Sequence, residues 1–148
     1  MNEKNIYGWY PLLRVIFIGN IEIVQLLIEY ANQYQIILEL NKKNEDGWNP
    51  LLWAIYENNI EIVQLLIKYA NQHQIILELN EKNLYGNNPL FSAIYKNNIE
   101  IVQLLLEYAL QHQIIMEYDK KDIGNKPEIL KLLQNYEKEK GKKKRVNN

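Results

Sequence analysis

Residues 41–79 read NKKNEDGWNPLLWAIYENNIEIVQLLIKYANQHQIILEL. This stretch decides the fold, because residues 2–40 and 80–118 are copies of it with scattered substitutions. One glycine marks the same place in each copy, at intervals of 39 residues: Gly8, Gly47 and Gly86. A unit of this length cannot bury its own hydrophobic face, so the copies must stack on one another. The repeat predicts an elongated stack with long faces, a shape that favours binding over catalysis.

Each copy contains two helical patterns. In the middle copy, Gly47 supplies a turn position that tolerates a positive φ, and Pro50 follows where a helix can begin without losing a needed N–H. We expect a first helix over residues 50–57. A second helix is predicted over residues 60–72, where apolar residues cover more than one narrow stripe, as in a helix sandwiched between neighbouring units.

Two asparagines separate these helices. Asn58 and Asn59 suit a break, since asparagine tolerates a left-handed cap and also serves as a helix N-cap. The spacing of Asn58 and Glu61 predicts a capping box at the start of the second helix.

Two motifs in the middle copy carry a family resemblance. The first runs through Gly47, Pro50-Leu51 and Ala54, and the second through Glu61-Ile62-Val63 and Leu65-Leu66. They fall where the ankyrin repeat has G-x-T-P-L-H-x-A-A and E-I-V-x-L-L-L, so the chain resembles that family over residues 2–118. The resemblance implies an all-α fold, an ankyrin-like α-solenoid of stacked helix-turn-helix repeats with short connections, at 2–40, 41–79 and 80–118.

The repeats depart from the family pattern in two respects. The Thr and His of the T-P-L-H motif are replaced in each copy, by Tyr10 and Leu13, Asn49 and Leu52, and Asn88 and Phe91. We therefore expect the side-chain hydrogen bonds that rigidify the family's turn to be absent or altered. Each unit is also longer than the usual length of about 33 residues, and the extra residues fall around 71–77, where they extend the second helix or its following loop.

The two ends of the array differ. Residues 119–136 repeat only the second-helix pattern, which predicts a C-terminal capping half-repeat without a first helix. Residues 137–148 have few apolar side chains, so we expect a disordered basic tail there. Repeat 1 carries apolar Ile6, Phe17 and Ile18 where repeat 2 is more polar, which predicts either a face covered by an upstream repeat, a partner or a second copy in a homo-oligomer, or an apolar patch that stays exposed.

Charge and composition restrict the function classes. The net charge is −1; six basic and two acidic side chains give residues 137–148 a charge of +4, which leaves −5 for residues 1–136. An acidic body repels phosphate, so nucleic acid is expected to bind only weakly and only through the tail.

Lys142-Lys143-Lys144-Arg145 resembles a short nuclear import signal, with a solvated end as the alternative. The absence of cysteine, of a secretory leader and of a long apolar run favours a cytoplasmic protein with no membrane segment, nuclear localisation being the alternative.

The sequence offers little for catalysis, metal or cofactor binding. Ser92 is the only serine, threonine and cysteine are missing, and no G-x-S-x-G context or phosphate-binding loop is present. His73 and His112 lie one repeat apart without a third metal ligand, so solvated histidines are favoured over a metal site. We expect no catalytic residue, no cofactor, no metal and no enzyme activity.

Surface positions that vary between the copies are the candidate binding residues. The resemblance places them on turn tips and on the concave face of the first helices, and aromatic residues and arginine are enriched at binding hot spots. The predicted partner-binding residues are Tyr7, Trp9, Arg14, Phe17, Asp46, Trp48, Trp53, Tyr56, Tyr85, Asn87, Ser92 and Tyr95. The hypothesis is a non-catalytic module that binds an unknown protein partner through this aromatic face. The alternatives are rings that only cover the stack, a self-association module that uses repeat 1, and a nuclear adaptor directed by the tail.

Overall fold

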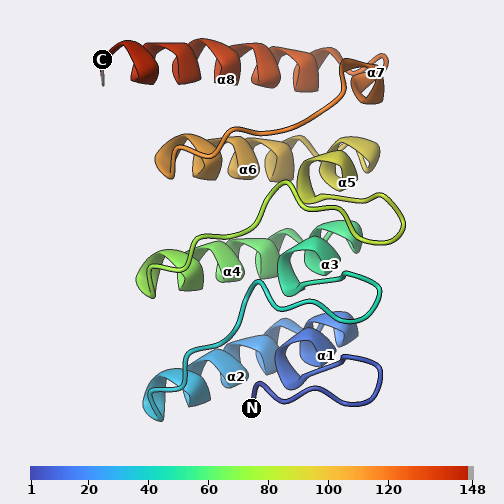
Figure 1. Cartoon of the computed structure of the whole chain (residues 1–148), viewed down its shortest axis with the longest axis vertical. Helices are drawn as coiled ribbons and strands as arrows, with labels where there is room; N and C mark the ends of the chain where they lie inside the picture. The colour runs from blue at the N-terminus through green and yellow to red at the C-terminus, as the bar shows by residue number, and fades with distance from the viewer. Residues whose placement is uncertain (147–148) are drawn as a thin grey trace.

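The computed structural model describes residues 1–146 and contains helices but no strand in that range. Its elements in chain order are α1 Pro11–Ile18, α2 Ile21–Gln33, α3 Pro50–Tyr56, α4 Ile60–Gln72, α5 Pro89–Tyr95, α6 Ile99–Gln111, α7 Lys120–Ile123 and α8 Pro127–Val146. Consecutive pairs form successive layers of one stack, from α1 and α2 at one end to α7 and α8 at the other (Figure 1). The all-α solenoid expected from the sequence is confirmed.

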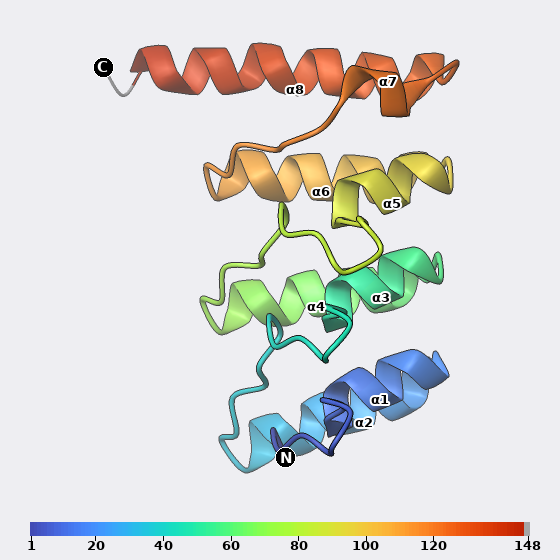
Figure 2. The same cartoon turned by 45° about the vertical axis from the view of Figure 1, so that its right-hand side comes forward.

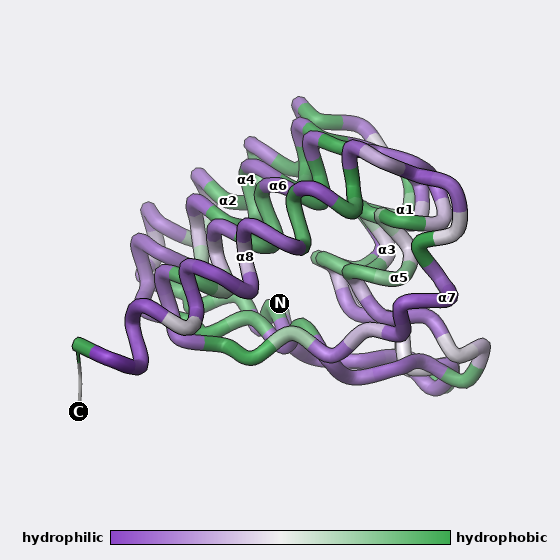
Figure 3. Tube along the Cα trace, turned by 90° about the horizontal axis from the view of Figure 1, so that it is seen from above, coloured by the Kyte–Doolittle hydropathy of each residue, from purple (hydrophilic) through white to green (hydrophobic). Residues whose placement is uncertain are grey.

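The helices stand in two columns. Helices α1, α3 and α5 follow one another in one column and α2, α4, α6 and α8 in the other, as the turned view makes clear (Figure 2). Seen from above, the loops that join the layers project to one side of both columns (Figure 3). The core lies between and within the columns, where residues such as Leu51, Ile55, Val63 and Leu66 are fully buried. None of the helices described has the length and apolar content needed to cross a bilayer.

Asparagines end one helix and begin the next, but with a register that differs from the prediction. Asn58 takes a left-handed φ of 61°, and the Asn59 side chain accepts the hydrogen bond from the Ile62 N–H. The predicted capping box between Asn58 and Glu61 is therefore wrong, because the N-cap is one residue later. Each second helix starts in this way, with N-caps at Asn20, Asn59 and Asn98.

Other asparagines hold the turn where the family motif is changed. The Asn49 side chain accepts from the Leu52 N–H and caps α3. Before it, the Asn44 side chain accepts from the N–H groups of Asp46 and Trp48 at 3.1 and 2.9 Å. The turn is thus rigidified by altered side-chain bonds, as the departures from T-P-L-H suggested.

Successive loops contact each other through their backbones. Gly47 has a φ of 86°, and a Cβ at this position would lie 2.9 Å from the Asn83 Cα of the next loop, closer than real Cβ contacts. The Leu84 N–H also donates to the Asp46 carbonyl across this junction at 2.9 Å. At Gly86, by contrast, no atom lies within 4 Å of such a Cβ, and the next unit has the helical turn α7 in the equivalent segment. Glycine is therefore required sterically at the first two loops and only by its φ at the third.

The extra residues of each repeat lie in the loop after the second helix. Helix α4 ends at Gln72, Gln74 takes a φ of 56°, and residues 75–79 then run without helical structure toward the next repeat. The Asn41 side chain clamps this segment, because its Nδ2 donates to the Ile76 carbonyl at 2.7 Å and its Oδ1 accepts from the Glu78 N–H at 3.0 Å.

A tyrosine of each following unit fixes the same segment from the other side. The Tyr69 hydroxyl accepts a hydrogen bond from the Leu38 N–H at 3.0 Å and donates to the Ile36 carbonyl at 3.4 Å. Tyr108 bridges Leu77 and Ile75 in the same way, and Tyr136 bridges Met116 and Ile114. Each hydroxyl thereby satisfies an amide that the stack removes from water. Tyr30, the equivalent residue of repeat 1, is 48% exposed.

The C-terminal unit corrects one prediction. Its single-turn helix α7 precedes Gly124 and Pro127, in the segment that forms the loop of the other repeats, and it packs against α5. The segment predicted as a disordered tail, 137–148, is helical through Val146, while its last two residues lie outside the described range.

Two interactions explain why the helix continues. Once Ile129, Leu133 and Tyr136 are buried, each further residue of α8 extends an existing helix without a new nucleation cost. Ion pairs at i,i+3 then join Glu137 to Lys140 and Glu139 to Lys142. The bond to the Lys140 ammonium lowers the pKa of Glu137, which keeps this carboxylate charged. Disorder was predicted from the low apolar content of residues 137–148, which does not reflect the stabilisation by these ion pairs.

The tyrosine bridge gives a direct stability test. We expect Tyr108→Phe to lower the free energy of unfolding by about 1–3 kcal/mol, because it leaves the buried Leu77 N–H without a partner. Tyr30→Phe is the matched control and should change it by less than ~0.5 kcal/mol. Urea unfolding measures both. Equal effects in the two variants would contradict a structural role for the hydroxyl.

Candidate protein-binding surface

Six rings form a continuous aromatic cluster beside the first helices. Its members are Trp9, Phe17, Trp48, Trp53, Tyr56 and Tyr85, which come from α1, α3 and the three loops. Edge-to-face and tilted ring pairs of this kind stabilise beyond the burial of their area. All six belong to the predicted partner-binding residues, and the fold brings them together.

Trp53 is the centre of the aromatic cluster. Its ring lies 4.9 Å from Phe17, 4.8 Å from Trp48, 5.9 Å from Tyr56 and 6.4 Å from Trp9, measured between centroids. The indole is half-buried, and its Nε1 has neither solvent exposure nor a hydrogen-bond partner. Trp53 therefore offers a partner part of its ring but not its N–H.

The burial of two predicted residues corrects the list of candidates. Trp48 is only 6% exposed and Ser92 only 3%. Trp48 sits under Trp53, Tyr56 and Tyr85, which explains why its ring is covered. Neither side chain presents a substantial surface to a flat partner. The half-buried members are Trp9, Trp53 and Asn87, and the exposed ones are Tyr7, Arg14, Phe17, Asp46, Tyr56, Tyr85 and Tyr95.

Cations border the aromatic cluster. The Arg14 guanidinium lies 5.8 Å from the Trp9 ring and 5.7 Å from the Phe17 ring, and the Lys96 ammonium lies 5.0 Å from the Tyr56 ring. Cations over aromatic faces are attracted by the ring quadrupole, and the attraction grows when water is excluded. Lys96 was missed by the sequence analysis, because its copies at Glu57 and Ile18 share no chemical type with it.

A pocket of about 210 Å³ opens between α3 and α5 at the edge of this surface. Its lining residues are Tyr56, Asn87, Phe91, Ser92, Tyr95 and Lys96. Aromatic walls with a few polar groups are typical of sites that receive a side chain or a small ligand. Three of the predicted residues that lie outside the aromatic cluster, Asn87, Ser92 and Tyr95, are brought together here.

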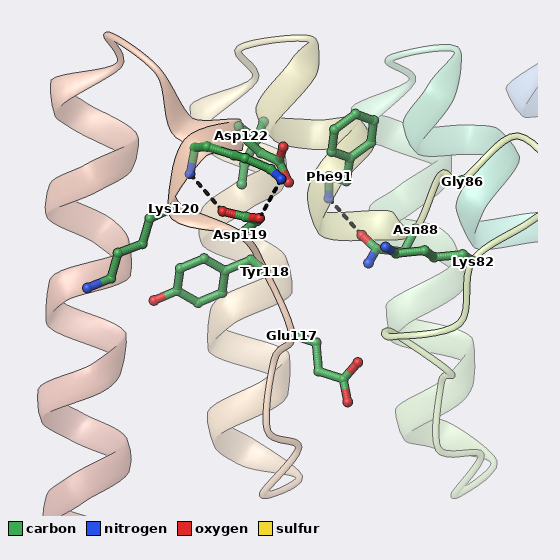
Figure 4. Close-up of a pocket in the computed structure, with 11 residues that line it drawn as sticks. Lys82, Gly86, Asn88, Phe91, Glu117, Tyr118, Asp119, Lys120 and Asp122 are labelled. Atoms are coloured by element: carbon green, nitrogen blue, oxygen red, sulfur yellow. Dashed lines mark hydrogen bonds and ion pairs between the residues drawn. The ribbon is translucent and has the colours of Figure 1, made fainter.

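A larger hollow of about 680 Å³ lies between α5 and α7 (Figure 4). Its lining residues come from α5, from the loop before α5 and from the segment through α7. Two of the charged residues that line it are paired: Asp119 forms an ion pair with Lys121, and the hydrogen bond from the Lys121 backbone N–H lowers the pKa of Asp119. Burial raises the pKa of Tyr118 to about 12, and its hydroxyl donates to Glu137. These groups brace the junction, and their protonation states are fixed at neutral pH.

The two histidines have structural surroundings. His73 stacks on Tyr69 with ring centroids 4.1 Å apart, and its Nε2 lies 3.0 Å from the Asn32 Oδ1 of the preceding repeat. His112 repeats this arrangement with Tyr108 and Asn71. Within residues 1–146, no three histidine, cysteine or acidic side chains gather as metal ligands would.

Burial separates structural rings from surface rings, which can be tested. We expect Trp48→Ala to lower the free energy of unfolding by about 3–5 kcal/mol, since it removes a buried ring with three aromatic neighbours. Tyr95→Ala is the control: this ring is 72% exposed, so the expected change is below ~0.5 kcal/mol. Denaturant midpoints measure both. A Trp48 variant as stable as the Tyr95 variant would contradict this assignment.

Comparison with known proteins agrees with the geometry. A family model described as ankyrin repeats (3 copies) matches residues 1–75 and 33–122. The structure is similar to the crystal structure of an ankyrin repeat domain from Acinetobacter baumannii AYE, with a TM-score of 0.65, 24% identity, and coverage of 91% of this chain and 68% of that one. The search of curated proteins found no significant match. Because the family model spans most of the sequence and the fold agrees with it, this chain belongs to the ankyrin repeat family.

Proposed function

We propose that this protein binds a protein partner through the exposed members of the aromatic cluster and the adjoining α3–α5 pocket. Ankyrin repeats are generally protein–protein interaction modules, and their fold is typically a non-enzymatic scaffold. One observation carries the finer proposal: a contiguous aromatic surface occupies positions that differ among otherwise similar repeats.

The variation argues against a role in packing alone. Some positions that pack the stack keep the same residue, as at Val24, Val63 and Val102, which are fully buried in all three repeats. The position of Trp53, in contrast, holds Arg14 in repeat 1 and Ser92 in repeat 3. A single packing environment would not accept these three side chains. A surface that must match the uneven contours of a partner has no such requirement.

The chemistry of the surface fits recognition of a protein. Large rings such as Phe17 and Tyr56 lose little conformational entropy on binding and give much contact area. Arg14 and Lys96 lie over those rings and are available to pair with carboxylates of a partner. Aromatic anchors with a charged rim are the usual composition of energetic hot spots.

Selection of binding peptides tests this proposal. We expect a random-peptide library to yield sequences that bind the wild-type protein and lose at least about tenfold in affinity to Phe17→Ala/Tyr56→Ala, a loss of about 1.4 kcal/mol. Fluorescence polarisation measures the affinities, and unfolding midpoints show whether the variant remains folded.

The control is Tyr34→Ala, which removes another exposed tyrosine, just after α2. Peptides that bind the double variant as well as the wild type, or that respond only to Tyr34→Ala, would place the binding surface elsewhere.

Self-association through repeat 1 is a second candidate function, favoured by the exposure of α2. On α2, the exposed fraction is 40% for Ile23, 62% for Leu26 and 48% for Tyr30. In repeat 2, Ile62 is equivalent to Ile23 and Tyr69 to Tyr30, and both are only 1% exposed because the preceding repeat covers them. Ile6 and Ile18, which the sequence analysis singled out, are exposed too. The exposed α2 face corresponds to a face that is buried in repeat 2, and a second copy of the protein would cover it.

Sedimentation velocity tests this candidate. We expect Leu26→Glu to weaken any self-association by about tenfold or more, since it would bury an unpaired charge. Leu84→Glu is the matched control, because Leu84 is 75% exposed in the third loop, far from α2. A wild type that stays monomeric over the accessible concentration range would exclude this function.

A further inference from the structure

The α3–α5 pocket lies where the preceding repeat places a tryptophan. Ser92 occupies the position of Trp53, one repeat later. Three ring neighbours of Trp53 are Phe17, Trp48 and Tyr56. Shifted by one repeat they become Tyr56, Asn87 and Tyr95, and all three line the pocket together with Ser92. The pocket of about 210 Å³ is therefore the space that an aromatic side chain fills one layer below.

The floor of the pocket carries an unused hydrogen-bonding group. Ser92 is 3% exposed, and its Oγ is buried without a hydrogen-bond partner. A serine hydroxyl can donate one hydrogen bond and accept others, and leaving it unpaired in a buried place is unfavourable. A ligand that brings a polar atom to this depth would satisfy it.

We propose that this pocket binds a tyrosine side chain of a protein partner. The proposal rests on the proposed function and names the residue that the partner inserts. The tyrosine ring would lie between Tyr56 and Tyr95, as the Trp53 ring lies between Phe17 and Tyr56, and its hydroxyl would bond the Ser92 Oγ.

The chemistry of the floor selects tyrosine among the aromatic residues. Phenylalanine would leave the Ser92 hydroxyl unpaired, so it would gain the ring contact but no hydrogen bond. Tryptophan offers only a donor, and its N–H lies at the side of the ring. A phenol carries a donor and an acceptor at its tip, which is the part that reaches the floor.

The rim adds a charge preference. The Lys96 ammonium lies over the Tyr56 ring at 5.0 Å and forms no ion pair with any described residue. A carboxylate next to the inserted tyrosine would pair with it. The partner segment is therefore a tyrosine flanked by an acidic residue.

Titration with amino-acid amides, followed by NMR, tests the pocket itself. We expect N-acetyl-L-tyrosinamide to shift the amide resonances of Ser92, Asn87 and Tyr95, and to bind about tenfold more tightly than N-acetyl-L-phenylalaninamide. Ser92→Trp fills the pocket with the side chain of repeat 2 and should abolish these shifts. Arg14→Trp places the same new ring at the equivalent position of repeat 1 and should leave them intact.

A second variant keeps the test decisive if Ser92→Trp fails to fold. Ser92→Ala preserves the pocket and removes only the hydroxyl, so it should remove the preference for tyrosinamide over phenylalaninamide. Equal affinity of the two probes for the wild type, or shifts that survive in a folded Ser92→Trp protein, would overturn the proposal.

The peptides selected on the whole surface separate this proposal from the proposed function. A shared tyrosine in those peptides and a loss of binding to Ser92→Trp would support both. Peptides that lack tyrosine and ignore Ser92→Trp, yet respond to Phe17→Ala/Tyr56→Ala, would overturn the tyrosine pocket and leave the binding function standing. Tyrosinamide binding without any selected peptide would support the pocket and count against the wider surface.

Discussion

The array depends on a buried tyrosine hydroxyl that accepts a hydrogen bond from one backbone N–H and donates one to a backbone carbonyl of the preceding loop. The loop after each second helix exposes backbone donors and acceptors that no helix or strand satisfies. Tyr69 resolves this for the first loop by bonding the Leu38 N–H and the Ile36 carbonyl. The same geometry recurs at Tyr108 and Tyr136. Because the tyrosine belongs to the next unit, the loop is fixed only when the units stack, which couples local loop structure to assembly of the whole array.

Asparagine has the complementary role within and between units. Its short amide accepts from nearby N–H groups at turns, as Asn44 does, starts second helices, as Asn59 does, and spans to the next loop, as Asn41 does. Backbone geometry is thereby specified by few side chains. The exposed positions on the loops and first helices are free to vary. That freedom is what allows one scaffold to carry Trp53 in one layer and a pocket at Ser92 in the next.

Periodicity was sufficient to predict the helices and the stacking, because one pattern repeated three times leaves little ambiguity about which residues face neighbours. It was insufficient wherever a residue is defined by a distant contact. The tyrosine bridges join residues between 20 and 33 positions apart, and no local pattern distinguishes Tyr69 from Tyr30. The burial of Trp48 depends on rings from neighbouring layers, and the helix through residues 137–146 depends on ion pairs and on anchoring by earlier residues. The candidate surface could be predicted as a set of variable positions. Which of these positions are buried depends on packing between the layers, and the sequence alone does not show it.

The repetition of the tyrosine bridge at every junction has a consequence for how such an array evolves. Every junction uses the same donor and acceptor set, so an in-frame duplication of one repeat would create a new junction whose bonds are already encoded on both sides. A deletion of one repeat would rejoin two surfaces that match equally well. Duplication or deletion of a repeat in the gene can therefore change the number of layers and still encode a protein that folds. Single substitutions at positions such as Ser92 then change what each layer binds.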